Sequence, residues 1–157
     1  MPLTLERTGP TTATITRSFA APPARVFAAH SDPALVRQWL TGPEGWVMVR
    51  CEIDLRPGGS LRYDWQALDG SFAFHLTAEV LEAEPPHRIL HVERMFLPDR
   101  TPDNRVETRF LPEGAGTRMV MTMQVEAPET LDAMLATGMA EGMEASYARL
   151  ERELPAA

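Results

Sequence analysis

The chain contains no lysine: all 15 residues of the lysine and arginine total are arginine. Schiff-base chemistry with a carbonyl substrate is therefore excluded, since that reaction needs a lysine amine. The chain also has a single cysteine, Cys51, which cannot form an internal disulfide and so suits a reducing compartment. We interpret Cys51, which stands between Val49 and Ile53 in an apolar pattern, as a buried and unreactive thiol.

Three further absences limit location and partners. No apolar run approaches the roughly 18 residues that a membrane-spanning helix requires. The first seven residues lack the basic region and apolar stretch of a secretory signal. We therefore expect a cytoplasmic protein with no membrane partner. With a net charge of −7, the chain also lacks the basic surface that a nucleic-acid partner requires.

The composition is that of one soluble domain. A chain of 157 residues, with 44% hydrophobic and 24% charged residues, can bury a substantial core. Residues 1–10 are polar and include Gly9 and Pro10, so we expect them to form a flexible arm. Residues 11–157 are expected to form a single domain.

The middle of the chain has the pattern of a β-sheet. Residues 46–126 alternate apolar and polar side chains, with turn signals at residues 57–59, 69–70 and 114–116. A segment rich in threonine and isoleucine at residues 12–19 adds a first strand. The alternation predicts seven strands in a sheet with one apolar face that needs a cover.

Helices are predicted on both sides of the long strand region. Two short helices follow the first strand: Pro23 lies in the first turn of one, and Asp32 is the expected N-cap of the other. A long amphipathic helix is predicted over residues 128–154, because apolar residues recur there at four-residue steps. These residues are Leu131, Leu135, Met139, Met143 and Tyr147.

Two glycines fall inside this last helix, where each destabilises a helix by about 1 kcal/mol relative to alanine. Gly138 and Gly142 are one turn apart and lie on the side expected to be buried. They either let the sheet approach the helix closely or leave room for a ligand. We favour close packing.

Four segments in order resemble one family. They are FAAPPARVF at residues 19–27, QWLTGP at 38–43, DLRPGGSLR at 54–62 and VLEAEPPHRI at 80–89. Their order resembles that of the START and birch-pollen-allergen superfamily (SRPBCC), in the group similar to the C-terminal domain of the activator of the heat shock protein 90 ATPase. The resemblance extends from about residue 12 to residue 153.

The resemblance implies an α+β helix-grip fold. In that fold a seven-stranded curved antiparallel sheet wraps around the C-terminal helix, with two short helices between the first two strands. It also implies a ligand cavity between sheet and helix. Two positions depart from the family, which often has tryptophan at both. Here they are Glu93, on the fifth strand, and Met143, in the last helix.

The candidate ligand-binding residues are those expected to face this cavity. Methionine is flexible and polarizable, so a methionine cluster suits varied apolar ligands, and large aromatic residues can roof or line a cavity. Core packing is the alternative role for each of them. The set comprises Trp39, Trp46, Tyr63, Trp65, Phe74, His91, Glu93, Met119, Met121, Met139, Met143 and Tyr147.

His91 and Glu93 are the one pair that could perform acid–base chemistry. They are two residues apart on one strand and so share a face. If Ile89 and Met95 point inward, the pair enters the cavity; if Leu90, Val92 and Phe96 point inward instead, it faces solvent.

We expect no metal and no cofactor. His87 and His91 would be about 13 Å apart along a strand, which is too far for one zinc ion. The chain has no Gly-x-Ser-x-Gly motif of a nucleophilic serine.

Three functions remain open. The first is non-catalytic binding of a small hydrophobic molecule such as a lipid, a sterol or a polyketide. The second is an enzyme resembling a cyclase or aromatase, with His91, Glu93 and Tyr63 as its polar groups. The third is a chaperone-linked module of the stress response, which the family name implies. A homodimer is compatible with each.

Overall fold

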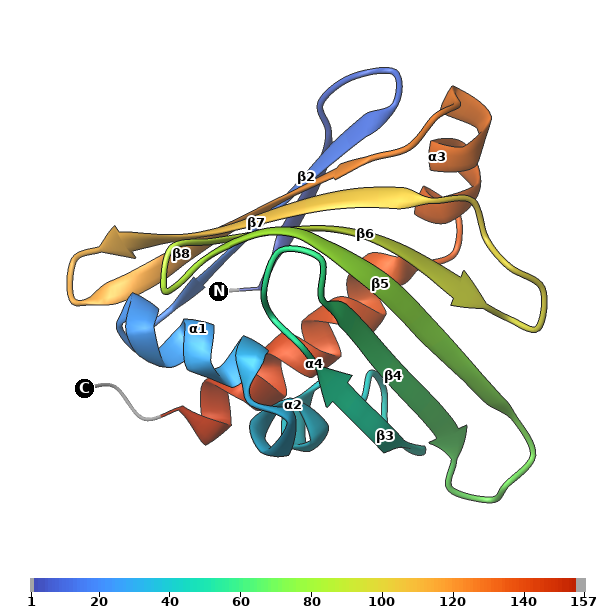
Figure 1. Cartoon of the computed structure of the whole chain (residues 1–157), viewed down its shortest axis with the longest axis horizontal. Coiled ribbons are helices and arrows are strands. Elements are labelled where there is room, and N and C mark those ends of the chain that lie inside the picture. Colours follow the sequence, from blue (N-terminus) through green and yellow to red (C-terminus); the bar gives the residue numbers. More distant parts are fainter. Residues whose placement is uncertain (1, 155–157) are drawn as a thin grey trace.

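The computed structural model describes residues 2–154 and shows a curved sheet with helices packed against it (Figure 1). In chain order the elements are β1 (Thr4–Arg7), β2 (Thr12–Phe19), α1 (Pro23–Ser31), α2 (Pro33–Trp39), β3 (Trp46–Ile53), β4 (Ser60–Ala67), β5 (Ala73–Glu84), β6 (Arg88–Phe96), β7 (Asn104–Glu113), β8 (Gly116–Gln124), α3 (Pro128–Leu135) and α4 (Met139–Glu153). This order confirms the expected α+β helix-grip fold.

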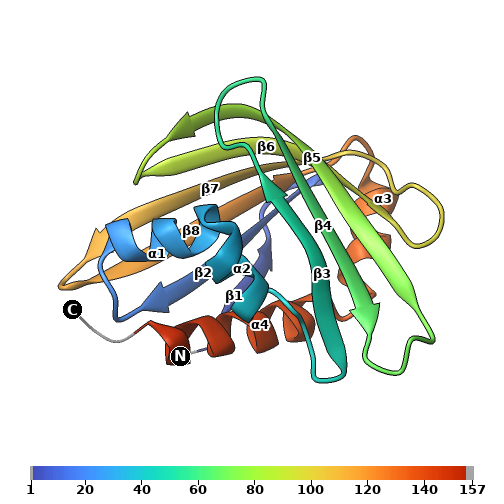
Figure 2. The same ribbon diagram turned by 60° about the horizontal axis from the view of Figure 1, so that its bottom comes forward.

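All neighbouring strands pair antiparallel in one sheet, in the order β1-β2-β8-β7-β6-β5-β4-β3. The sheet is curved, and α1, α2 and α4 lie on its concave side (Figure 2). Burial alternates along strands such as β2, as expected when one face is covered by helices.

The described part of the chain has eight strands where the sequence predicted seven. The additional one is β1, which lies within residues 1–10, so the expectation of a flexible arm there was wrong. β1 pairs with β2, with Leu5 opposite Ile15. The backbone N–H of Leu3 also donates a hydrogen bond of 2.8 Å to Glu144 of α4. The segment is therefore part of the sheet.

The two short helices form as predicted. α1 begins with Pro23 in its first turn. Asp32 caps α2, because its Oδ1 accepts a hydrogen bond of 3.0 Å from the backbone N–H of Ala34. The indole N–H of Trp39 donates to the carbonyl oxygen of Ala29 at 2.9 Å, which ties α2 to α1.

The single helix predicted over residues 128–154 is wrong, because α3 ends at Leu135 and α4 begins at Met139. Gly138 has φ of +74°, a left-handed conformation that favours glycine and stops a helix. A Cβ placed on Gly142 would meet no atom within 4 Å. The close packing that we favoured is therefore wrong at both glycines, and open space lies beside Gly142.

The core consists of three apolar clusters. The first lies beneath the helices and includes Phe27, Trp39, Phe110 and Tyr147. The second lies mainly on β3–β5, and the third joins β2, β7 and β8 to Leu131 of α3. β6 runs between the strands of the second and third clusters, so its concave face is where these clusters meet.

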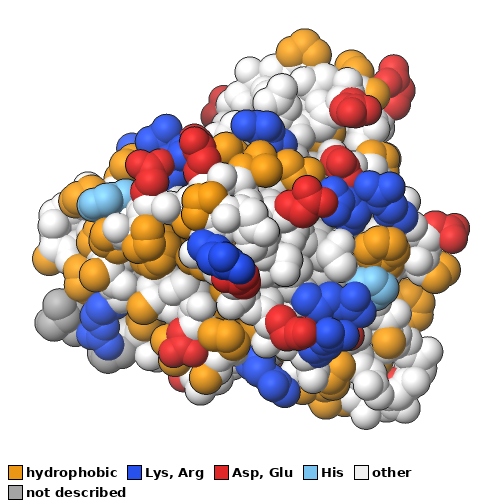
Figure 3. Space-filling model, in the orientation of Figure 1, with side chains coloured by type: hydrophobic (Ala, Val, Ile, Leu, Met, Phe, Trp, Pro, Cys, Tyr) orange, Lys and Arg blue, Asp and Glu red, His pale blue; other side chains and the backbone are white. Residues whose placement is uncertain are grey.

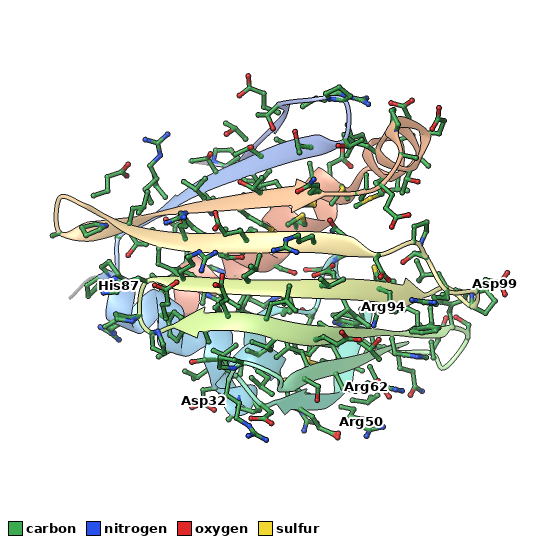
Figure 4. All side chains as sticks on the ribbon, turned by 45° about the horizontal axis from the view of Figure 1, so that its top comes forward. Asp32, Arg50, Arg62, His87, Arg94 and Asp99 are labelled. Atoms are coloured by element: carbon green, nitrogen blue, oxygen red, sulfur yellow. The ribbon has the colours of Figure 1, made fainter. Side chains whose placement is uncertain are left out.

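The convex face is covered by arginine–carboxylate pairs. Examples are Arg62 with Asp64 at 2.5 Å and Arg94 with Asp103 at 2.8 Å. Arg62 and Arg94 come from β4 and β6 and lie at the side of the sheet turned away from the helices (Figure 4). Blue and red side chains are mixed on the surface shown in Figure 3, without a large patch of one sign.

Candidate functional site

The register of β6 places His91 and Glu93 on the concave face. His91 is opposite Val80 of β5 and Val106 of β7, and both valines are buried. Directly paired residues of antiparallel strands point to the same side of a sheet. Ile89, which shares this parity, belongs to the first apolar cluster. The inward alternative is therefore the one that the structure adopts.

His91 and Glu93 bind each other. Nε2 of His91 lies 2.7 Å from Oε1 of Glu93, and their side chains are 12% and 24% exposed. When Glu93 is ionised, its carboxylate only accepts hydrogen bonds, so Nε2 of His91 is the donor in this contact. Nδ1 of His91 is sealed from solvent and has no partner. In a neutral imidazole this atom is an unused acceptor.

Asn104, the first residue of β7, is a further polar group of this face. It is 7% exposed, it is paired in register with Glu93, and its Oδ1 is buried without a partner. Sequence reasoning missed it because Asn104 follows Pro102 and Asp103 in a segment that reads as a loop. The available signal was that Asn104 stands two residues before Val106, a spacing that places both side chains on the same face of a strand. We call His91, Glu93 and Asn104 the polar cluster.

Two tyrosines adjoin the polar cluster. Tyr63 of β4 and Tyr147 of α4 are 9% and 4% exposed. Burial raises the pKa of both phenols, and the charge of Glu93 raises them further. Side chains from β4, β6, β7 and α4 therefore converge around one carboxylate.

The predicted methionines have two different environments. Met119 and Met123 are fully buried, at 0% and 2% exposed, and fill the core. Met121, Met139 and Met143 are only half-buried and border the third apolar cluster. Only the second group therefore keeps some exposure to solvent.

Trp46, Trp65 and Phe74 pack together on β3–β5, and the ring of Trp65 also meets that of Tyr63 edge-on at 5.7 Å. Trp46 and Phe74 have ring centroids 5.3 Å apart, and Trp65 stacks on Phe74 at 5.0 Å. The indole N–H of Trp65 donates to the carbonyl oxygen of Leu40 at 2.8 Å. Trp39 stacks on Tyr147 at 5.6 Å, so it packs behind the tyrosine. The predicted site residues therefore do not form one pocket.

The surface of the described residues includes two depressions on or beside the sheet. One of about 260 Å³ is lined by Val49, Asp64, Trp65, Ala73, Phe74, His75, Phe96 and Pro98. The other, of about 360 Å³, is lined by Arg100, Thr101, Pro102, Asp103 and Glu126. Neither is lined by a residue of α4 or by the polar cluster.

A buried ion pair lies on the α4 side of the site. Arg17 of β2 is 2% exposed and contacts Glu144 at 3.0 Å and Glu151 at 3.1 Å, both on α4. Burial alone would lower the pKa of Arg17, but these two carboxylates raise it. The charges of Arg17 and Glu144 also act on Tyr147.

The family model described as Activator of Hsp90 ATPase homolog 1-like protein matches residues 20–155. The chain belongs to this family. The resemblance seen in four short segments is thus confirmed over most of the chain, and the matched residues include strands β3–β8, the polar cluster and α4.

Solved structures agree with this membership. The chain is similar to a protein from Rhodobacter sphaeroides, with 33% identity, a TM-score of 0.91, and 98% of this chain and 97% of that chain covered. A protein from Mycobacterium smegmatis is 25% identical, with a TM-score of 0.85 and 99% of both chains covered. An AHSA1-like protein from Aeromonas hydrophila, at 21% identity and a TM-score of 0.73, shares the fold over 90% of this chain and 93% of that chain. Comparison with curated proteins finds no match.

No helix within residues 2–154 is long and apolar enough to cross a membrane. In the same part of the chain, no three His, Cys, Asp or Glu side chains are grouped so that they could hold a metal ion.

Proposed function

We propose that this chain binds a small molecule with an apolar body and one polar group, between the concave face of the sheet and α4, without transforming it. One observation carries the proposal. Nδ1 of His91 and Oδ1 of Asn104 are sealed from solvent without partners, on neighbouring strands. A buried polar atom without a partner destabilises a protein by about 1–3 kcal/mol, and native proteins contain few of them. A ligand that bonds to both atoms removes that penalty.

The apolar body of the ligand would lie against the half-buried methionines. Met121, Met139 and Met143 border the third apolar cluster, and open space lies beside Gly142. Methionine side chains are unbranched and repack easily. Binding on the concave face therefore requires movement of side chains and leaves the sheet unchanged. A lipid, a sterol or a polyketide has an apolar body of this kind.

Acid–base catalysis is a second candidate, favoured by the contact of 2.7 Å between His91 and Glu93. Such a pair can move a proton on a bound polyketide-like chain, as in a cyclase or aromatase. The two candidates differ in turnover. A binder returns its ligand unchanged, whereas an enzyme converts many equivalents and loses that activity in His91→Gln while still binding.

The family name suggests a third role, as a cytoplasmic stress-response module that acts on the Hsp90 ATPase. Its support is the name alone. Purified Hsp90, tested with and without this chain, measures the effect directly: a change in ATPase rate would favour this role over ligand binding.

Titration with the neutral dye Nile red, together with native mass spectrometry of the purified protein, tests the binding proposal. Met143→Trp places a larger ring on the concave side of α4 and is expected to reduce dye uptake. Leu111→Trp is the matched control, because Leu111 of β7 is 41% exposed. Equal uptake by both variants, or no uptake by the wild type, would contradict the proposal.

A further inference from the structure

The charges around the polar cluster favour a ligand of one sign. The charges that act on the Tyr147 hydroxyl are those of Glu93, Arg17 and Glu144. Arg17 is already bound by Glu144 and by Glu151. Glu93, Glu144 and Glu151 thus give three negative charges against the one positive charge of Arg17. Glu93 is the carboxylate that Arg17 does not bind.

Arg149 is another cation of α4. Its guanidinium donates hydrogen bonds to the side-chain oxygen of Thr41 and to the carbonyl oxygen of Gly42, in the loop after α2. It is therefore held at that loop. An anionic ligand head placed beside Glu93 would be repelled by the charge of that carboxylate.

The unused hydrogen-bonding atoms of the polar cluster are acceptors. Nε2–H of His91 is directed at Glu93, which leaves Nδ1 of the neutral imidazole as an acceptor. Oδ1 of Asn104 is a second acceptor, and the carboxylate of Glu93 has oxygen lone pairs beyond its bond to His91. Three acceptors from two strands match a group that has several N–H donors.

We propose that the ligand of this site is a cationic amphiphile: an ammonium group, bound by Glu93, His91 and Asn104, attached to an apolar body that lies against Met121, Met139 and Met143. This inference rests on the proposed function and specifies the class of molecule.

Three molecules that share a dodecyl chain test the inference: dodecylamine, dodecanol and dodecanoate, each titrated below its micelle concentration at pH 8, where a free imidazole is neutral. Tryptophan fluorescence and native mass spectrometry report binding. Hydrogen bonds to charged groups are about twice as strong as neutral ones, so the amine is expected to bind about tenfold more tightly than the alcohol. The carboxylate is expected to bind most weakly.

Glu93→Gln keeps the shape of the side chain and removes its charge, and it should abolish the preference for the amine over the alcohol. Glu79→Gln is the control, because Glu79 lies on the neighbouring strand β5 and its side chain is 67% exposed. The wild type alone is decisive if Glu93→Gln fails to fold. Equal binding of amine and alcohol, or tighter binding of the carboxylate, would overturn the cationic ligand and leave the proposed function standing. Binding of none of the three would overturn the proposed function itself.

Discussion

The ion pair between β2 and α4 leads to a prediction about unequal partners. Arg17 is 2% exposed, whereas the side chains of Glu144 and Glu151 are 27% and 39% exposed. Removal of one partner from a buried pair destabilises a protein by about 3–5 kcal/mol, because the other charge is left buried. In this pair the deeply buried charge is the arginine. Loss of a carboxylate should therefore be more harmful than loss of the arginine.

The magnitudes follow from the contacts. Glu144 accepts hydrogen bonds from Nε and Nη2 of Arg17 and from the backbone N–H of Leu3, while Glu151 accepts one from Arg17. Glu144→Gln leaves Arg17 with one carboxylate, so we expect a loss of about 3 kcal/mol, the lower end of the range for a broken buried pair. Arg17→Met leaves two carboxylates that water can reach, so we expect a loss of about 1 kcal/mol.

Urea unfolding followed by circular dichroism measures these losses as shifts of the midpoint at constant slope. Glu52→Gln is the control, since Glu52 and its partner Arg50 are 52% and 51% exposed and such pairs contribute at most about 1 kcal/mol. The reasoning is refuted if Arg17→Met destabilises the protein more than Glu144→Gln does.

The same pair predicts a dependence on pH. Burial works to raise the pKa of Glu144, but the hydrogen bonds from Arg17 and from Leu3 outweigh it and lower the pKa below its ordinary value. A carboxyl group with a lowered pKa in the folded state stabilises that state above the pKa of the unfolded chain and loses this contribution as pH falls. The difference in unfolding free energy between the wild type and Glu144→Gln should therefore shrink below about pH 4.

Two further predictions concern glycine and histidine. Gly142→Ala should stabilise the protein by about 0.5–1 kcal/mol in urea unfolding, because the new methyl group meets no atom within 4 Å. Gly138→Ala should destabilise it by about 1–2 kcal/mol, because φ is +74° there; equal effects would contradict the assigned helix stop. Burial lowers the pKa of His30 to about 4, despite a hydrogen bond to the carbonyl oxygen of Val26. As pH falls, His30 of the unfolded chain is therefore protonated before His30 of the folded protein. Stability should fall by about 3 kcal/mol between pH 6.5 and 4, and His30→Phe should remove that fall.

Much of the fold could be predicted because its physical signals are local. The alternation of residues 46–126 and their glycine turns predicted strands β3–β8, since a period of two residues marks a half-buried strand. β1 was missed because four residues are too few to show alternation. The break at Gly138 was missed because apolar residues continue at four-residue steps across it. Hydropathy carries no information about the sign of φ.

The site was harder to predict because it depends on register. Residues 89–96 are apolar on both faces, so the sequence left the direction of His91 open. Pairing with β5 decides it, and that pairing includes an irregularity between Val80 and Glu82. The approach of Tyr147 to Glu93 is a tertiary feature, which arises where α4 crosses the concave side of the sheet.

The two departures from the family have a joint physical consequence. Glu93 and Met143, which the resemblance marked as departures from the family, are a carboxylate and a flexible thioether. Glu93 bonds to His91 on the concave face, and its charge acts on two buried tyrosines. Each sealed atom of the polar cluster that lacks a partner costs about 1–3 kcal/mol, out of the 5–15 kcal/mol by which a typical domain is stable. A ligand that donates hydrogen bonds to these atoms would remove that cost, and the ammonium group of the proposed cationic amphiphile has both the donors and the charge to pair with Glu93.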